Sequence, residues 1–276
     1  TPPRRSLMHS ALHWIAEPWQ APLLARGGMV AMLTGAAAAA IGCWVLLRDL
    51  PFAAESLSHG MFPGLVGAAL LGIPIMLGGL IGLGLSAAAI FLARRFISEE
   101  SHSVAIAIIP LLGLGAIMAL SGPIPAGTGS ALFGDVLSTS TADLALALTV
   151  AVTVSLALYR LHWRLLSSGL QGASVSADGI ILVLLAIATA AAAIGLGALL
   201  AVALIIGPAA AAQRLYTRAS SMIIMASVIA VASVAIGIEL SWHLDVATGP
   251  AIAVSAIVPA ALATFLTSRS VNHGSR

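Results

Sequence analysis

Apolar residues run in long, uninterrupted stretches along most of this chain, from Met29 almost to the C-terminus. A helix needs about 20 mostly apolar residues to cross the hydrocarbon of a bilayer, whereas a β-barrel shows alternating runs of about ten. Because the stretches here are continuous, they predict an all-α, polytopic helical membrane protein with about eight or nine transmembrane helices. The predicted spans are 27–47, 56–73, 74–93, 104–120, 144–159, 180–194, 195–212, 222–238 and 246–266.

The stretch 180–212 is too long for one span. It contains no charged residue, and as a single helix it would be about 50 Å long, against about 30 Å of hydrocarbon. We therefore predict two elements that meet at a hinge between Gly195 and Gly197. The second element is expected to be interrupted at Gly207 and Pro208, because proline removes a helical hydrogen bond.

The positions of arginine predict the topology. All twelve basic residues are arginine, and they follow the first, third, fifth, seventh and ninth predicted spans or lie in the N-terminal segment. Since cytoplasmic loops are enriched in arginine and lysine, these loops and the C-terminus are predicted to be cytoplasmic. The missing lysine excludes a phosphate-binding loop of the G-x-x-x-x-G-K-[ST] type. The net charge of +2 comes from loop arginines, which gives no indication of nucleic-acid binding.

The pattern divides the chain into three parts. Residues 1–26 form a polar N-terminal segment, 27–268 a single transmembrane domain and 269–276 a polar C-terminal tail. In the N-terminal segment we expect a helix that lies along the membrane surface. Trp14 and Trp19 would anchor it there, because indole rings favour the interface between lipid and water.

A polar pair stands out from this background, in which only 8% of the residues are charged. Glu55 and His59 are four residues apart, so on a helix they share one face, with the hydroxyls of Ser56 and Ser58 nearby. A carboxylate and a neutral imidazole suit a divalent ion such as Zn²⁺ or Mn²⁺. The alternative is a pair at the end of a span, solvated by lipid headgroups.

Glycine is abundant in the predicted spans, and most of it is expected to serve close helix packing. Gly60 and Gly64 are predicted exceptions, because they flank Pro63 beside the polar pair. Their backbone carbonyls are expected to be exposed there.

Several motifs carry a family resemblance. The segment "LRDLPFAAESLSHGMFPG" at 47–64, "LFGDVL" at 132–137, "GALLAVALIIGPAAAA" at 197–212 and "LDVATGPAIAV" at 244–254 appear in this order. Over about 17–265 the chain resembles the membrane subunits of ABC importers for manganese, zinc or iron, the ABC-3 family. The resemblance implies a fold similar to that of the vitamin B12 permease. It also implies that Glu55, where the family usually has aspartate, and His59 handle the metal.

The resemblance further implies a contact with an ATPase in the cytoplasmic loop 161–179. Family members commonly have an F-D-x-x-x-A-x-x-x-G segment there. If Gly179 is its last glycine, Gln171 stands where the aspartate would align. The predicted ATPase contact therefore includes Arg164, Gln171 and Gly179.

An outward loop near 239–245 contains Glu239, Trp242, His243 and Asp245. A solvated loop is the plain interpretation. The functional alternative is that His243 and Asp245 contact the protein that delivers the metal.

Together these observations predict a permease subunit, not itself an enzyme, in the bacterial plasma membrane. It would carry a divalent ion of manganese, zinc or iron and hold no permanent cofactor. Its expected partners are a separate ABC ATPase, an extracellular or periplasmic metal-binding protein, a second permease copy and the lipid bilayer. The alternatives are a permease for a metal chelate or a cobalamin-like ligand, and an ion-coupled secondary transporter, for which no inverted repeat is evident.

Overall fold

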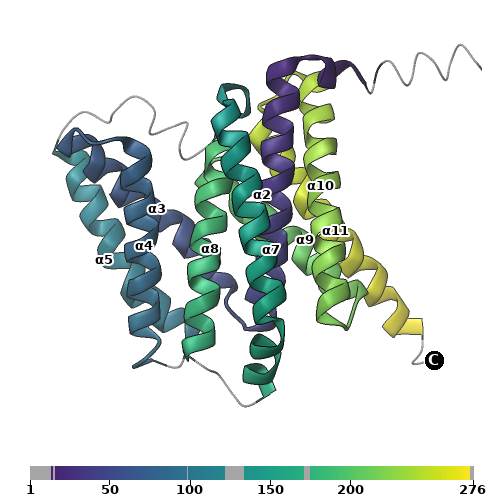
Figure 1. Cartoon of the computed structure of the whole chain (residues 1–276). Helices are drawn as coiled ribbons and strands as arrows, with labels where there is room; N and C mark the ends of the chain where they lie inside the picture. Colours follow the sequence, from purple (N-terminus) through teal and green to yellow (C-terminus); the bar gives the residue numbers. More distant parts are fainter. Residues whose placement is uncertain (1–13, 15, 98, 122–133, 171–174, 274–276) are drawn as a thin grey trace, which may run out of the picture.

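The computed structural model describes residues 14, 16–97, 99–121, 134–170 and 175–273, and within these ranges the protein is a bundle of long helices without strands (Figure 1). The elements are α2 (Pro22–Leu47), α3 (Pro51–Leu71), α4 (Ile75–Ala93), α5 (Glu100–Leu120), η1 (Val136–Ser138), α7 (Thr141–Leu170), α8 (Val175–Leu196), α9 (Ala198–Leu215), α10 (Ala219–Leu244) and α11 (Thr248–His273). Each predicted span corresponds to one long helix, which confirms the all-α, polytopic fold class.

Six of these helices are long and apolar enough to cross a membrane, within the part of the chain that the structure describes. They are α2, α4, α5, α7, α10 and α11, and shorter apolar stretches lie in α8 and α9. Helix α3 has a suitable length but does not meet the same criterion, since it carries the polar residues of the 47–64 segment.

Proline and glycine set the ends of the first helices. Pro22 and Pro51 occupy the first turns of α2 and α3, where a missing backbone N–H costs nothing. Helix α3 ends at Gly72, which adopts a left-handed conformation with φ of 69°. The first span was predicted to start at Gly27, but α2 begins five residues earlier because the proline start favours the helix.

The long apolar stretch 180–212 is divided into two helices, as predicted, but the second of these helices is not interrupted. Gly197, with φ of 79°, separates α8 from α9, which confirms the predicted hinge. The predicted interruption at Gly207 and Pro208 is wrong, because α9 continues through both residues. A proline frees one backbone carbonyl, and packed transmembrane helices tolerate this.

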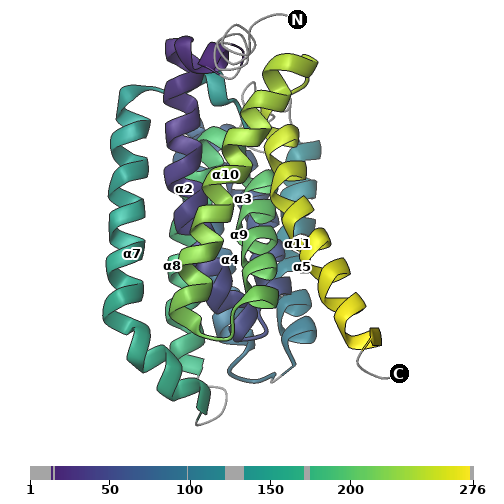
Figure 2. The same ribbon diagram turned by 90° about the vertical axis from the view of Figure 1, so that its right-hand side faces the viewer.

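Helix α2 lies at the centre of the larger part of the bundle. It packs against α7, α8, α9 and α10 and is the most deeply buried of the six candidate spans. Small residues allow this packing: a Cβ atom at Gly42 would lie 1.8 Å from the backbone oxygen of Ile205 in α9. Close approach through glycine and alanine is typical of helices in lipid. Figure 2 shows α7 beside this group, on the outside.

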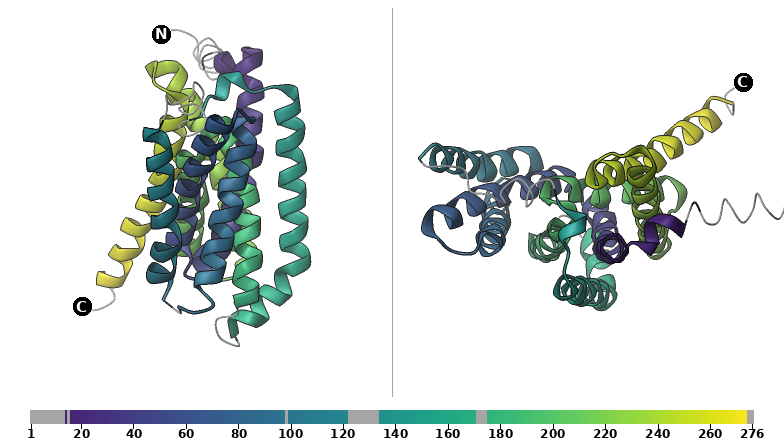
Figure 3. Two further views of the ribbon diagram at one scale, coloured as in Figure 1. Left: turned by 90° about the vertical axis from the view of Figure 1, so that its left-hand side faces the viewer. Right: turned by 90° about the horizontal axis from the view of Figure 1, so that it is seen from above.

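Helices α3, α4 and α5 form a second group at one end of the molecule, as the view from above in Figure 3 shows. These three helices pack more extensively against one another than against the rest of the bundle. Their main contacts with the rest are those of α4 with α8 and of α3 with α9. A buried core that includes Trp44, Leu57, Leu83 and Leu185 joins the two groups.

Helix ends that carry arginine meet on one side of the molecule. Helices α2, α4, α7 and α9 end on the side where α11 also ends (Figure 1). This is the arrangement that the alternating arginine pattern predicts. We call this side the arginine end.

Candidate metal site and its surroundings

Glu55 and His59 lie one turn apart on an exposed face of α3. The Nδ1 atom of His59 is 3.1 Å from the backbone oxygen of Glu55. In the tautomer with hydrogen on Nδ1, this atom donates to the oxygen, and Nε2 presents a free lone pair. Such a backbone contact is the usual way in which a metal-binding imidazole is oriented.

The two serines do not join this pair. Ser56 and Ser58 are buried, and the Ser58 hydroxyl has no hydrogen-bond partner within the described residues. They were expected as nearby hydroxyls, but they point into the bundle because the exposed face of α3 is narrow. The open face therefore offers one carboxylate and one imidazole.

The two glycines beside the pair pack against α4. A Cβ atom at Gly64 would lie 2.0 Å from the backbone oxygen of Gly78, and one at Gly60 would lie 1.9 Å from Oγ of Ser86. The expectation that they expose carbonyls to the pair is wrong, because their small size is needed where α3 and α4 touch. The backbone that carries Glu55 and His59 is held rigidly from behind.

The pair lies part of the way along the bundle. At about 1.5 Å per residue, Glu55 is about 6 Å and His59 about 12 Å from the start of α3 at Pro51. The hydrocarbon of a bilayer is about 30 Å thick. His59 therefore lies more than a third of that thickness from the arginine end of its helix.

The described residues of one chain do not complete a metal site around this pair. Within the described residues, no group of three or more histidine, cysteine, aspartate or glutamate side chains is arranged to hold an ion. Sites for zinc and manganese use four or more ligands. For the pair to hold such an ion, further ligands would have to come from beyond the described residues, for example from another molecule or from water.

A buried charge cluster at the arginine end was not predicted. The carboxylate of Asp178, in the first turn of α8, pairs with Arg48 at 3.1 Å and with Arg94 at 2.8 Å. Arg48 also donates to the backbone oxygen of Leu165 in α7 at 2.9 Å. These contacts join α7 and the ends of α2, α4 and α8. We call Arg48, Asp178 and Arg94 the arginine–aspartate clamp.

A second contact connects this region to α3. The carboxylate of Glu100, in the first turn of α5, accepts a hydrogen bond from the backbone nitrogen of Ala53 at 2.8 Å. It thus satisfies one of the free N–H groups in the first turn of α3. In the sequence, Arg48 and Arg94 indicate topology, but nothing in their spacing shows that they share one carboxylate. Lone carboxylates at the starts of apolar spans were the signal for Asp178 and Glu100.

The predicted ATPase contact has a different local structure from the one expected. Residues 161–170 continue α7 and are not a loop, because no proline or glycine interrupts the helix before Gly169. Arg164 is exposed near the end of α7, and Gly179 lies in α8 against the ring of Phe91. Gln171 lies outside the described residues.

The N-terminal segment contacts the end of α10 that lies opposite the arginine end. Trp19 donates from Nε1 to Glu239 at 2.8 Å, and the ring of Trp14 stacks on His243 with 3.6 Å between centroids. Nε2 of His243 is 3.4 Å from the same carboxylate. His243 is thus partly covered, whereas Asp245, which ends α10 with φ of 53°, is exposed. Residues 14 and 16–20, which include both tryptophans, are helical; that this helix lies along the membrane surface stays a prediction.

Known proteins share both the sequence pattern and the fold. A model of the ABC 3 transport family matches residues 20–267. The manganese transport system membrane protein MntC of Halalkalibacterium halodurans is 31% identical over 206 residues, which cover 70% of each chain. The chelated iron transport system membrane protein YfeC of Yersinia pestis is 26% identical over 223 residues, which cover 77% of this chain and 76% of that protein.

The fold is also similar to a solved structure. PsaBC from Streptococcus pneumoniae in complex with Fab has a TM-score of 0.76 at 23% identity, over 90% of this chain and 94% of that one. The bundle, with its polar pair on α3, is therefore that of a multi-pass ABC transport permease. The chain belongs to the ABC 3 transport family.

Proposed function

We propose that this chain is the permease subunit of an ATP-driven importer for a divalent transition metal ion, with manganese as the first candidate. The observation that carries the proposal is the Glu55–His59 pair on the exposed face of α3. The names of relatives that transport manganese or chelated iron support the class of cargo.

The ion would pass between two copies of the chain. Each copy supplies the Glu55 carboxylate and the His59 imidazole, and two copies supply four side chains, enough for a tetrahedral site. A pair that is half of a site also releases its ion when the two copies separate. Transport requires such release, which a closed structural site would prevent.

ATP hydrolysis would take place on a separate chain, since this one has no lysine for a phosphate-binding loop. We propose that the ATPase binds at the arginine end, around Arg164 and the start of α8. The arginine–aspartate clamp would then carry motion from α7 and α8 to α2 and α4. Helix α4 packs directly on α3, which carries the pair.

The orientation follows from the arginines. We propose that the arginine end, including the C-terminus, is cytoplasmic. The metal-binding protein would approach the opposite end, where the exposed Asp245 and the partly covered His243 lie. Neither residue carries the proposal by itself.

Uptake of radiolabelled Mn²⁺ and Zn²⁺ tests the proposal. Cells would express the chain with its neighbouring ATPase and metal-binding protein, as wild type or as His59→Ala at equal membrane levels. We expect uptake to fall at least about tenfold, because replacing even a residue that only orients a metal ligand commonly lowers metal affinity or activity by this factor. His102→Ala is the matched control, since His102 is exposed and its ion-pair partner among the described residues is the equally exposed Glu99. Wild-type uptake by His59→Ala would overturn the proposal.

Iron is the second candidate cargo, because one set of relatives is named for chelated iron. The same cells would be given labelled Fe²⁺, alone or with a tenfold excess of Mn²⁺. Competition by Mn²⁺ would place both ions on one pathway. Iron uptake that persists in His59→Ala would instead indicate a cargo that does not need the pair.

A further inference from the structure

An apolar groove of about 770 Å³ lies between α4 and α8, where the two groups of helices meet. Leu80, Phe91, Val183 and Ile187 contribute to its walls, and no charged residue is among those that the structure describes there. Leu80 and Val183 are exposed, so the groove opens on the outside of the bundle. Its volume is in the range of small-molecule sites.

The groove has the length of one membrane leaflet. From Leu80 to Phe91, helix α4 rises about 16 Å, which is about half of the hydrocarbon thickness of about 30 Å. Phe91 closes the groove at the arginine end, because its ring packs on Gly179 of α8. A Cβ atom added at Gly179 would lie 2.6 Å from this ring. The groove thus matches the acyl region of the leaflet on the arginine side.

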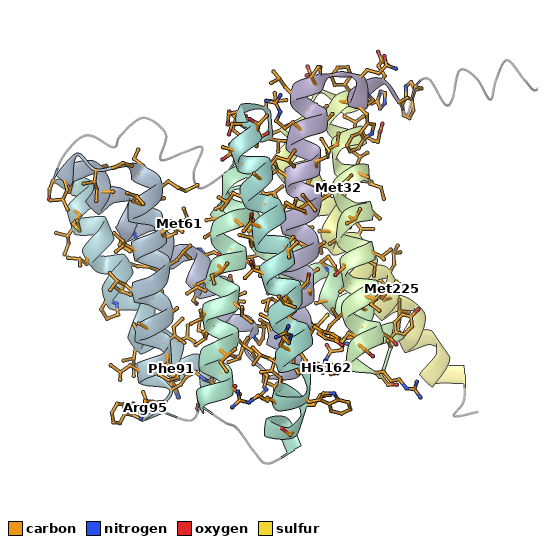
Figure 4. All side chains as sticks on the ribbon, viewed as in Figure 1. Met32, Met61, Phe91, Arg95, His162 and Met225 are labelled. Carbon is orange, nitrogen blue, oxygen red and sulfur yellow. The ribbon has the colours of Figure 1, made fainter. Side chains whose placement is uncertain are left out.

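Positive charge follows directly at this end of α4. Arg95 is exposed and makes no ion pair with any residue that the structure describes. Figure 4 places Phe91 and Arg95 at the same end of the helix. In Arg94, Nη2 binds Asp178, but Nη1 is buried without a partner within the described residues. Guanidinium groups bind phosphate well, and basic sites between transmembrane helices bind anionic headgroups.

We propose that the groove between α4 and α8 binds an acyl chain of an anionic phospholipid, with its phosphate at Arg95 and close to Arg94. The lipid would fill the junction between the group that carries the Glu55–His59 pair and the rest of the bundle. This inference does not depend on which ion the protein carries.

Native mass spectrometry of the purified full chain tests the groove. The chain would be titrated with phosphatidylglycerol or with phosphatidylcholine of the same acyl chains. Gly84 lines the groove, and a Cβ atom there meets nothing within 4 Å, so Gly84→Leu fills the space without a clash. We expect this variant to lose one bound phosphatidylglycerol.

Gly113→Leu is the matched control, since Gly113 is an equally open, exposed glycine on α5, away from the groove. It should retain the lipid. Equal lipid retention by Gly84→Leu and the wild type would overturn the proposal. Disulfide-linked dimers of Gly84→Cys in membranes would also overturn it, because they would show that a second copy covers the groove.

Arg95→Gln tests the headgroup contact independently of packing at Gly84. One arginine near a membrane surface contributes a factor of about five in binding, so the preference for phosphatidylglycerol over phosphatidylcholine should fall about fivefold. Arg218→Gln, which removes another exposed charge at the arginine end, should leave the preference unchanged. An unchanged preference in Arg95→Gln would contradict the headgroup assignment.

Discussion

Glu55 has one more methylene group than the aspartate that the family resemblance leads one to expect at this position. On α3 its side chain is exposed, so the longer carboxylate has room to extend toward a partner outside its own bundle. The orienting contact of His59 comes from the backbone of Glu55 and not from its carboxylate. The position of the imidazole is therefore independent of the length of side chain 55.

This independence leads to a prediction for two substitutions. Glu55→Ala should lower Mn²⁺ uptake at least about tenfold through loss of a ligand. Glu55→Asp should keep uptake and change the ratio of Mn²⁺ to Zn²⁺ transport, since only the reach of the carboxylate differs. Labelled uptake with both ions in competition measures this ratio. Wild-type uptake by Glu55→Ala would place the carboxylate off the pathway.

Among the helices, Arg48 and Arg94, which in the sequence indicate only topology, hold the helix ends together through Asp178. Asp178 is 4% exposed, and its partners Arg48 and Arg94 are 7% and 10% exposed. Taking such charges out of water is costly, and the cost is recovered only while all partners are present. The clamp is therefore sensitive to the loss of its single carboxylate.

Asp178→Asn should destabilise the bundle by about 3–5 kcal/mol, the usual cost of leaving a buried charge without its partner. The measurement is thermal unfolding of the purified protein in detergent, together with its level in membranes. Asp245→Asn is the control, because Asp245 is exposed in a left-handed conformation that asparagine also adopts. Equal stability of the two variants would exclude the clamp as a structural element.

Particular residues show how far the sequence determines the fold and the site. Continuous apolar runs, alternating arginines and Gly197 predict the nine long helices of the described residues and their direction, but not all of their ends, because lipid imposes length and charge position only approximately. The shared face of Glu55 and His59 follows from helical spacing, whereas their role with metal was expected only from the family resemblance and stays a prediction. The clamp does not, because Arg48 and Asp178 are far apart in sequence and only packing brings them together. Gly60 and Gly64 were misread for the same reason.

At the scale of the whole molecule, the clamp, the end of α7 that carries Arg164 and the end of α11 lie on one side, at the arginine end. The opposite end carries the contacts of Trp14 and Trp19 with α10. The two ends thus differ in both charge and partners. From this difference we predict that the arginine end faces the cytoplasm.

Cysteine labelling tests the orientation. Cys43 is buried, so single cysteines placed elsewhere report their own position. A reagent that does not cross membranes should label Ala247→Cys, in the turn between α10 and α11, in intact cells. It should label Thr217→Cys, between α9 and α10, only after the cells are opened. The reverse pattern would invert the proposed topology.

The contact of Gly64 with Gly78 also limits how this protein can evolve. The atoms that a side chain at Gly64 would meet all belong to the backbone of Gly78 and Gly82, so no neighbouring side chain there could shrink to make room for a larger residue. Packed helices usually change in sequence through pairs of substitutions, in which a larger residue on one helix is offset by a smaller one on the other. Such a pair is not available at Gly64. If the Glu55–His59 pair binds the ion as proposed, substitutions that tune the choice of ion are expected on the open face of α3, where both side chains are exposed.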